Sequence, residues 1–433
     1  MRALLLINLA IPRSGTACHR QLCNAPGSHG TKGDKSEAPT REEFSLRVPS
    51  RLGSAIAAAG VTAALLITGA LPFAGPAFAS TAAPAVSFGG ASHAVFVQTD
   101  NPSGNRVVAY HRAPDGVLSQ AGTYATGGLG GILAGSAVDH LASQGSLSYD
   151  PRHSLLYAVN AGSDSVAVFA VNGDRLALRQ VLGSGGSFPV SVATRGDLVY
   201  VLNALGGGRL QGFRVLGGGL VPIPGSGRAL GLDPTASPQF TNTPGQVAFT
   251  PDGSQLIVTT KANGNDIDVF GVRFDGQLSA APVVNSEPGT VPFAISFDFY
   301  GHLVIAESGT NALATFALAA SGTASLIDAV PTGASATCWV APAGPFLFAS
   351  NAGSASESGY LSSFGGKLSL LGAAATDAGS VDASAAAGGR FLYVQAGRAG
   401  IVDEYAVGAG ASLTEIGSVT VPGAVGGEGI VAF

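Results

Sequence analysis

The chain has 433 residues, a formal net charge of −5, and only 11% charged residues. It is rich in Gly, Ala, Ser and Val, which suits tight hairpins and closely packed sheets and argues against a helical or an acidic disordered protein. Its arginines are scattered and form no basic stripe, so nucleic acid is excluded as a partner.

The first 79 residues are predicted to be an N-terminal extension that ends in an export signal. Arg47 and Arg51 precede an apolar run over residues 55–73, and a small-x-small cleavage site follows at residues 77–79. This order predicts a secreted, extracellular protein whose signal peptide is cleaved after Ala79, with membrane contact only through that signal. The alternative is an uncleaved membrane anchor, although the run is barely long enough to span a bilayer.

Removal of residues 1–79 changes the charge and the cysteine content. That segment holds 8 of the 22 basic and 4 of the 27 acidic residues, which leaves 14 against 23 and a net charge of −9. Cys338 becomes the only cysteine, so no intramolecular disulfide can hold the fold together. We assign residues 80–92 to a linker and residues 93–433 to the folded domain.

A short strand pattern, apolar residues that end in an aromatic one, recurs seven times. The copies are Val107–Tyr110, Val166–Phe169, Leu210–Phe213, Ile267–Phe270, Leu313–Phe316, Leu361–Phe364 and Val402–Tyr405. A repeat of roughly 45 residues with several short strands is typical of a β-propeller blade. We therefore predict an all-β fold, a seven-bladed β-propeller with four antiparallel strands per blade.

Each blade should have one inner strand that lines the central channel. The predicted inner strands span residues 146–149, 190–193, 246–249, 294–297, 337–340, 382–385 and 429–432. The first blade has none of its own, because residues 95–97 already have the pattern of a second strand. We expect the C-terminal residues 429–433 to pair inside the N-terminal blade, which closes the ring and removes an exposed sheet edge.

Two connections between blades are longer than the others. They span residues 123–143 and 227–243, and both lead into inner strands. We therefore expect both to lie over one face of the ring, near the channel mouth. Long loops on a rigid scaffold often carry binding residues, but they are also sites where insertions are tolerated.

The blade sequences resemble the YVTN-type repeat. The resemblance rests on Tyr157–Asn160 (YAVN), Tyr200–Asn203 (YVLN), Pro251–Gly253 (PDG) and the aromatic third strands. More closely, residues 93–433 resemble the secreted lactonase-like seven-bladed propellers of bacteria. That superfamily contains the propeller-type 6-phosphogluconolactonases and the 3-carboxymuconate-lactonizing enzymes. The resemblance implies the fold more strongly than it implies an activity.

Three residues that enzymes of this family use are absent at the matching positions. The resemblance would place a His at Gly145, an Arg at Gly245 and a Glu at Lys261. The acid/base and anion-holding groups of the family are therefore missing, and lactonase activity by that mechanism is not expected.

Two carboxylates that directly adjoin inner strands, Asp382 and Glu428, are the main candidates for chemistry, and Lys261 is a third. Together they would supply acid, base and cation. The ligand-binding candidates share a polar or stacking side chain near the channel mouth: Gln144, Gln246, Trp339, Glu307 and His140. Trp339, the only Trp, suits stacking on a ligand as well as packing between blades. We predict no metal site and no cofactor.

The leading interpretation is an exported, monomeric propeller that binds a small molecule, a glycan or a protein through its channel mouth. The alternative is a lactone hydrolase or cycloisomerase that uses a different residue set. A third possibility is a purely structural surface module. An enzyme needs several ionisable groups in one hydrogen-bond network, whereas a binding protein needs only a pocket with one or two polar anchors.

Overall fold

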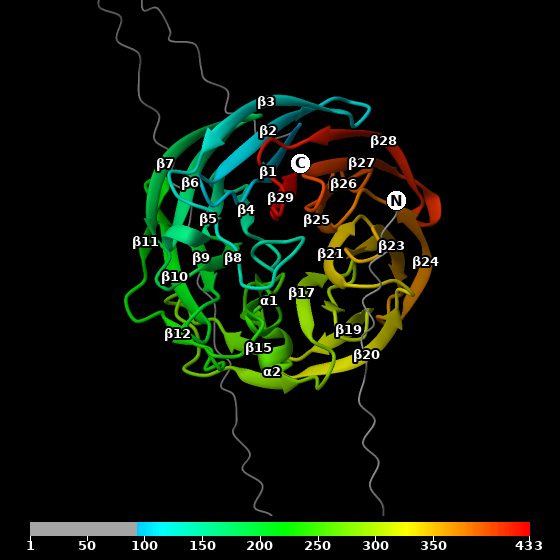
Figure 1. The fold of residues 1–433 in the computed structure, drawn as a ribbon. Coiled ribbons are helices and arrows are strands. Elements are labelled where there is room, and N and C mark those ends of the chain that lie inside the picture. The colour runs from blue at the N-terminus through cyan, green and yellow to red at the C-terminus, as the bar shows by residue number, and fades with distance from the viewer. Residues whose placement is uncertain (1–92) are drawn as a thin grey trace, which may run out of the picture. The chain divides into compact units, whose positions relative to one another are not determined.

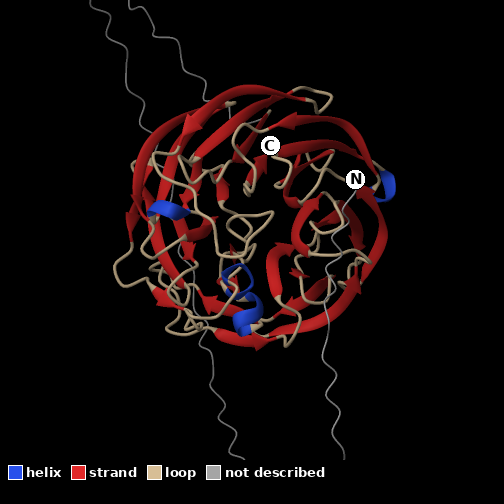
Figure 2. Cartoon of the chain, viewed as in Figure 1, coloured by secondary structure: helices blue, strands red, loops and turns tan. Residues whose placement is uncertain are grey.

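The computed structural model describes residues 93–433, which form seven antiparallel sheets arranged around a common centre (Figure 1). Six sheets have four strands, and the third blade adds a short fifth strand. Nearly all of the regular structure is strand (Figure 2). The predicted seven-bladed β-propeller is therefore confirmed. The predicted signal peptide and linker lie outside the described residues.

The first four blades, each written from the inner to the outer strand, have the following bounds. Blade 1 contains β29 (Ile430–Ala432), β1 (Ala94–Gln98), β2 (Arg106–Arg112) and β3 (Leu118–Ala125); blade 2 contains β4 (Leu147–Asp150), β5 (Leu155–Asn160), β6 (Ser165–Asn172) and β7 (Arg175–Gly183). Blade 3 contains β8 (Pro189–Arg195), β9 (Leu198–Asn203), β10 (Arg209–Leu216), β11 (Gly219–Pro222) and β12 (Arg228–Ala229); blade 4 contains β13 (Val247–Phe249), β14 (Gln255–Thr259), β15 (Asp266–Gly271) and β16 (Val283–Ser286).

The remaining three blades follow the same order. Blade 5 contains β17 (Pro292–Phe297), β18 (Leu303–Glu307), β19 (Ala312–Leu318) and β20 (Ala324–Pro331). Blade 6 contains β21 (Thr337–Ala343), β22 (Phe346–Asn351), β23 (Ser356–Ser362) and β24 (Leu368–Ala375), and blade 7 contains β25 (Ser380–Ala386), β26 (Phe391–Ala396), β27 (Ile401–Val407) and β28 (Leu413–Thr420).

The helical segments are short. They are η1 (Ala161–Ser163), α1 (Gln239–Asn242), α2 (Lys261–Gly264) and η2 (Ala409–Ala411). Within residues 93–433, no helix has the length and apolarity that a membrane crossing requires.

The burial of the strands follows their place in the blade. All six residues of β5, a second strand, are buried, because neighbouring blades pack on both of its faces. The outer strand β7 is mostly exposed, with only a few of its side chains turned inward. The hydrophobic cores therefore lie between blades and extend around the ring.

The ring closes as predicted. The C-terminal β29 pairs antiparallel with β1, and Val95, Phe96 and Val97 face Ala432, Val431 and Ile430 across the ladder. The Arg112 guanidinium donates two hydrogen bonds to the carbonyl oxygen of Phe433, at 2.9 and 3.2 Å. The two chain ends of the described domain thus complete one sheet, in which β29 supplies the inner strand of the first blade.

Candidate functional site

The two long connections meet over one face of the ring, as expected, and cover a pocket of about 350 Å³. The first connection leads from β3 to β4, and the second leads from β12 to β13. They contact each other through Gln239, whose side-chain oxygen accepts a hydrogen bond from the Ala134 N–H at 3.0 Å. The pocket therefore has a roof from these two connections and a floor from inner strands of the ring.

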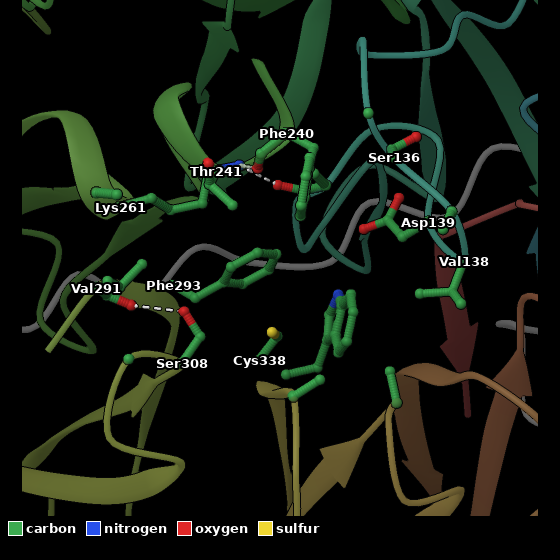
Figure 3. A pocket seen from close by; sticks show the side chains of 18 residues that line it. Ser136, Val138, Asp139, Phe240, Thr241, Lys261, Val291, Phe293, Ser308 and Cys338 are labelled. Carbon is green, nitrogen blue, oxygen red and sulfur yellow. Dashed lines mark hydrogen bonds between the residues drawn. The ribbon is translucent and has the colours of Figure 1, made fainter. Parts of the chain in front are cut away.

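The pocket is lined mainly by apolar side chains (Figure 3). Phe293 and Trp339 come from the inner strands β17 and β21, and their rings pack edge to face with centroids 5.2 Å apart. Phe240 of α1 lines the roof. The other lining residues are Gly135, Ser136, Ala137, Val138, Asp139, Ala142, Thr241, Lys261, Ala262, Val291, Ser308, Gly309, Ala336, Cys338 and Ala352. This lining suits a small, largely apolar molecule.

Lys261 ties both connections to blade 4. It begins α2, two residues after the end of β14, and its side chain is almost completely buried. Its ammonium group donates to the carbonyl oxygens of Ala142 at 2.6 Å and Phe240 at 2.7 Å, and to the Thr243 hydroxyl at 3.2 Å. All three N–H groups of the ammonium therefore donate hydrogen bonds, two of them to carbonyl oxygens of the roof.

The environment of Lys261 disfavours its charge. Burial lowers the pKa of Lys261 to about 7, and the nearby Asp139 carboxylate partly offsets this effect. The ammonium also lies 5.1 Å from the centre of the Phe293 ring, a cation–π contact. Because its hydrogens are used within the protein, Lys261 has little capacity left to bind an anionic ligand.

Asp139 supplies the carboxylate of the pocket. Its two oxygens accept hydrogen bonds from the backbone N–H groups of Leu141 at 2.8 Å and Ser143 at 2.9 Å, which shapes the turn that leads into the channel. Burial raises the pKa of Asp139 to about 6. Asp139 and Lys261 lie on opposite sides of the pocket (Figure 3), and no ion pair joins them in the described part of the chain.

Cys338 also lines the pocket. Burial raises the pKa of its thiol to about 12, so near neutral pH the side chain stays protonated and is a poor nucleophile. The neighbouring Ser308 donates its hydroxyl hydrogen to the Val291 carbonyl oxygen at 3.0 Å. Neither residue is therefore activated for nucleophilic attack.

The segment before β4 runs through the centre of the ring (Figure 1). The Gln144 side chain makes two hydrogen bonds to the backbone of Val340 in blade 6, at 2.9 and 3.0 Å. The indole N–H of Trp339 donates to the Ser143 carbonyl oxygen at 2.7 Å, and Ser191 of blade 3 donates its hydroxyl to the Gln144 carbonyl oxygen at 2.8 Å. Gln144 therefore links opposite sides of the ring, and the pocket lies beside this link.

We predict that Gln144→Leu lowers the free energy of unfolding by about 1–3 kcal/mol, because it leaves the buried N–H and C=O of Val340 without partners. Urea unfolding followed by circular dichroism measures the change. Gln120→Leu, at an exposed position of β3, is the matched control and should have almost no effect. Equal stability of the Gln144 and Gln120 variants would contradict a linking role for Gln144.

Asp382 and Glu428 come close together, but neither lines the pocket. Asp382 accepts hydrogen bonds from its neighbour Ala383 and from the N–H of Ile430, at 3.0 and 3.2 Å. Glu428 accepts one from the N–H of Gly145 at 2.9 Å. Burial raises the pKa of both carboxyl groups, and their mutual repulsion raises that of Glu428 further.

A further carboxyl group, Asp100, adjoins this pair. It accepts a hydrogen bond from the Glu428 N–H at 2.7 Å, and burial raises its pKa to about 8. These groups are held by backbone hydrogen bonds inside the ring, where they connect blades 1, 2 and 7. The structure thus separates Asp382 and Glu428 from Lys261, the third member of the predicted catalytic set.

The remaining predicted ligand-binding residues are engaged elsewhere. Gln246 accepts a hydrogen bond from the backbone N–H of Ile295 at 2.5 Å, and Glu307 accepts one from the Thr310 hydroxyl at 2.8 Å. His140 is half-buried, its Nδ1 has no hydrogen-bond partner, and burial lowers its pKa. Of the five residues, only Trp339 lines the pocket.

Three pocket residues, Asp139, Phe240 and Phe293, were not predicted from the sequence. Asp139 and Phe240 lie inside the two long connections, so their position in those loops was the available signal. Phe293 immediately precedes the predicted inner strand 294–297, and nothing in its local pattern distinguishes it from a core residue.

Residues 93–433 contain no group of three or more His, Cys, Asp or Glu side chains with the geometry to hold a metal ion. Gly145 and Gly245 lie two residues before the first residues of β4 and β13, at the positions where the resemblance would place a His and an Arg. A Cβ at Gly245 would lie 2.7 Å from the Phe293 carbonyl oxygen, so the local packing requires glycine there. The inferred loss of the family's catalytic residues stays a prediction.

No family model matches the chain, and no curated protein is similar to it in sequence. Solved structures are similar in fold. A putative 6-phosphogluconolactonase from Bacteroides fragilis has a TM-score of 0.60 at 18% identity, over 77% of this chain and 97% of that one. A periplasmic gluconolactonase from Pseudomonas aeruginosa has a TM-score of 0.62 at 17% identity, over 78% and 98%. Residues 93–433 thus have the fold of the lactonase-like seven-bladed propellers.

Proposed function

We propose that the protein is an exported binding protein for a small, uncharged and mostly apolar molecule, held in the pocket between Phe293, Trp339 and the two long connections. The apolar character of this pocket is the observation that carries the proposal. Ligand sites commonly combine such a lining with a few polar groups that fix orientation. Asp139 is the polar anchor, which favours a ligand with an N–H or O–H donor.

The charges of the pocket support an uncharged ligand. Lys261 uses its hydrogens on the roof, and its charge lies opposite that of Asp139. A phosphorylated or carboxylated sugar lactone needs free cationic donors, which this lining does not offer. The similar Pseudomonas aeruginosa protein is periplasmic, which accords with export of the present chain.

A neutral probe with one donor, N-phenylnaphthylamine, tests the proposal. We expect one molecule to bind per chain and to quench Trp339, the only tryptophan, by energy transfer. Ala352→Phe fills the pocket and should weaken binding at least about tenfold, corresponding to about 1.4 kcal/mol. Ala373→Phe, on the exposed outer strand β24, is the matched control and should bind as the unaltered protein does.

Two results would overturn the proposal. One is failure of the probe to bind, or equal binding by the Ala352 and Ala373 variants. The other is turnover of a lactone panel that Asp382→Ala or Glu428→Ala abolishes, because it would establish the alternative, a lactone hydrolase or cycloisomerase.

A further inference from the structure

Four carboxyl groups from distant parts of the chain meet inside the ring. Asp100 follows β1, Asp139 lies in the first long connection, Asp382 lies in β25 and Glu428 precedes β29. All four residues are almost completely buried, and the other three carboxyl groups are near enough to Glu428 to repel it. We call these four residues the carboxyl cluster. Such a cluster is costly unless its charges are paired or neutralised by protons.

The surroundings of the carboxyl cluster supply little positive charge. No ion pair within residues 93–433 includes any of its four members. The titratable groups that face it from neighbouring elements are Glu357 of β23, Cys338 of β21, His140 of the first connection and Lys261 of α2. Burial lowers the pKa of His140, which leaves its ring uncharged near neutral pH. Lys261 is therefore the only cation among these groups, and it lies across the pocket from Asp139 (Figure 3).

Protons neutralise the cluster instead. The side chains of Asp382 and Glu428 hydrogen bond to each other, which two ionised carboxylates cannot do because neither has a hydrogen to donate. Burial raises the pKa of Asp100 to about 8, that of Asp382 to about 7 and that of Asp139 to about 6. The cluster therefore holds protons at about pH 5 and loses them in part as the pH rises to about 8.

Ser143 connects the carboxyl cluster to the pocket. Its hydroxyl donates to a carboxyl oxygen of Glu428 at 3.3 Å, and its backbone N–H donates to Asp139 at 2.9 Å. Its carbonyl oxygen accepts the indole N–H of Trp339 at 2.7 Å. One residue thus joins Glu428 to Asp139 and Trp339, both of which line the pocket.

The end of the first connection also rests on the cluster through its backbone. Glu428 accepts the N–H of Gly145 at 2.9 Å, and the Ser146 hydroxyl donates to the Glu428 carbonyl oxygen at 2.7 Å. The N–H of His140 donates to the Gly426 carbonyl oxygen at 2.8 Å. Asp139 belongs to the roof, whereas the other three carboxyl groups belong to the ring. Ionisation therefore sets roof and ring against each other, since buried like charges repel strongly.

We propose that the carboxyl cluster couples closure of the pocket roof to protonation. With its protons bound, the cluster holds the end of the first connection against the ring; as the protons leave, repulsion of Asp139 loosens the roof. A ligand of the closed pocket is then bound more tightly at acidic pH, because binding and proton uptake are linked. This consequence for the ligand rests on the proposed function, whereas the coupling itself does not.

Acrylamide quenching of Trp339 in the ligand-free full chain tests the coupling, because this residue is the only tryptophan and is buried beneath the roof. From about pH 5 to about pH 8 we expect the quenching constant to rise at least about threefold, as the open population grows. Circular dichroism at each pH checks that the protein remains folded.

Two variants should each reduce this rise to less than about half. Glu428→Gln offers a hydrogen to Asp382 at every pH and keeps an acceptor for Gly145. Asp100→Asn removes a second carboxyl group, and Asn tolerates the left-handed backbone at this position, where φ is 49°. Glu415→Gln, at an exposed position of β28, is the matched control and should behave as the unaltered protein does. If one variant fails to fold, the other decides.

The outcomes separate the coupling from the proposed function. Coupling is supported if quenching follows these expectations and if N-phenylnaphthylamine binds at least about tenfold more tightly at about pH 5 than at about pH 8. If the probe binds at no pH, the proposed function fails, and quenching alone decides the coupling. Quenching that does not change with pH overturns the coupling. An equal rise in the variants and the control also overturns it, because Lys261 would then be the source of the pH dependence.

Discussion

Replacing Lys261 with Met is expected to loosen the roof of the pocket. The variant leaves the carbonyl oxygens of Ala142 and Phe240 and the Thr243 hydroxyl without their donor. Unpaired buried acceptors cost about 1–3 kcal/mol each, partly offset here because a buried charge is also removed. We expect amide hydrogen exchange in residues 133–143 and 239–243 to speed up at least about tenfold, corresponding to about 1.4 kcal/mol of local opening.

Trp339 provides a second measurement of the same opening. It is the only tryptophan and lies beneath the roof, so its emission should shift to the red in the Lys261 variant as water enters. Lys367→Met is the matched control, since Lys367 is the only other lysine of residues 93–433 and is exposed. A Lys261 variant with the exchange rates and emission of the unaltered protein would show that the ammonium does not hold the roof.

Stability is expected to fall as the pH rises from about 4 to about 8. Burial raises the pKa of Asp100 to about 8 and that of Asp382 to about 7, and it raises the pKa of Glu428 well above its usual range. Within this window the folded protein binds more protons than the unfolded chain, so the free energy of unfolding decreases with pH. Each unit of pKa difference is worth about 1.4 kcal/mol, and the loss should reach a few kcal/mol.

Lys261 acts in the opposite direction, but mainly at higher pH. Burial lowers its pKa to about 7, so above that pH the unfolded chain binds the extra proton and stability rises. Urea unfolding at about pH 5 and about pH 8 therefore reports mainly the carboxyl groups, because Lys261 offsets their effect only over the last pH unit of that range. Greater stability at about pH 8 than at about pH 5 would contradict the prediction.

Glu428→Gln should stabilise the protein at about pH 8 and flatten the pH dependence. The amide carries no charge to repel Asp382 and Asp100, and its oxygen can still accept the hydrogen bond from Gly145. Glu415→Gln, at an exposed position of β28, is the matched control and should leave the pH dependence unchanged. An unchanged slope in the Glu428 variant would exclude Glu428 as a source of the pH dependence.

The repeat alone determined the fold of this protein. Seven copies of one strand pattern predicted seven blades, because each blade alternates apolar residues in the same way and buries them against its neighbours. The copy predicted at Leu361–Phe364 was misplaced: β23 ends at Ser362, and the buried Tyr360 holds the aromatic position that Phe364 was expected to hold. The missing inner strand of the first blade also predicted ring closure by residues 429–433, and β29 pairs with β1 as expected. The two long connections stood out by length, so their common position over one face was predictable as well.

Only the tertiary structure decided which polar residues face the pocket. Gln144 and Gln246 had the right strand positions, yet both side chains pair with the backbone of other blades. Lys261, by contrast, donates hydrogen bonds to Ala142 and Phe240, which are 119 and 21 positions away from it in the sequence. A local pattern records burial and strand period, whereas a site assembled from loops and several blades depends on side-chain directions that arise only when the ring closes.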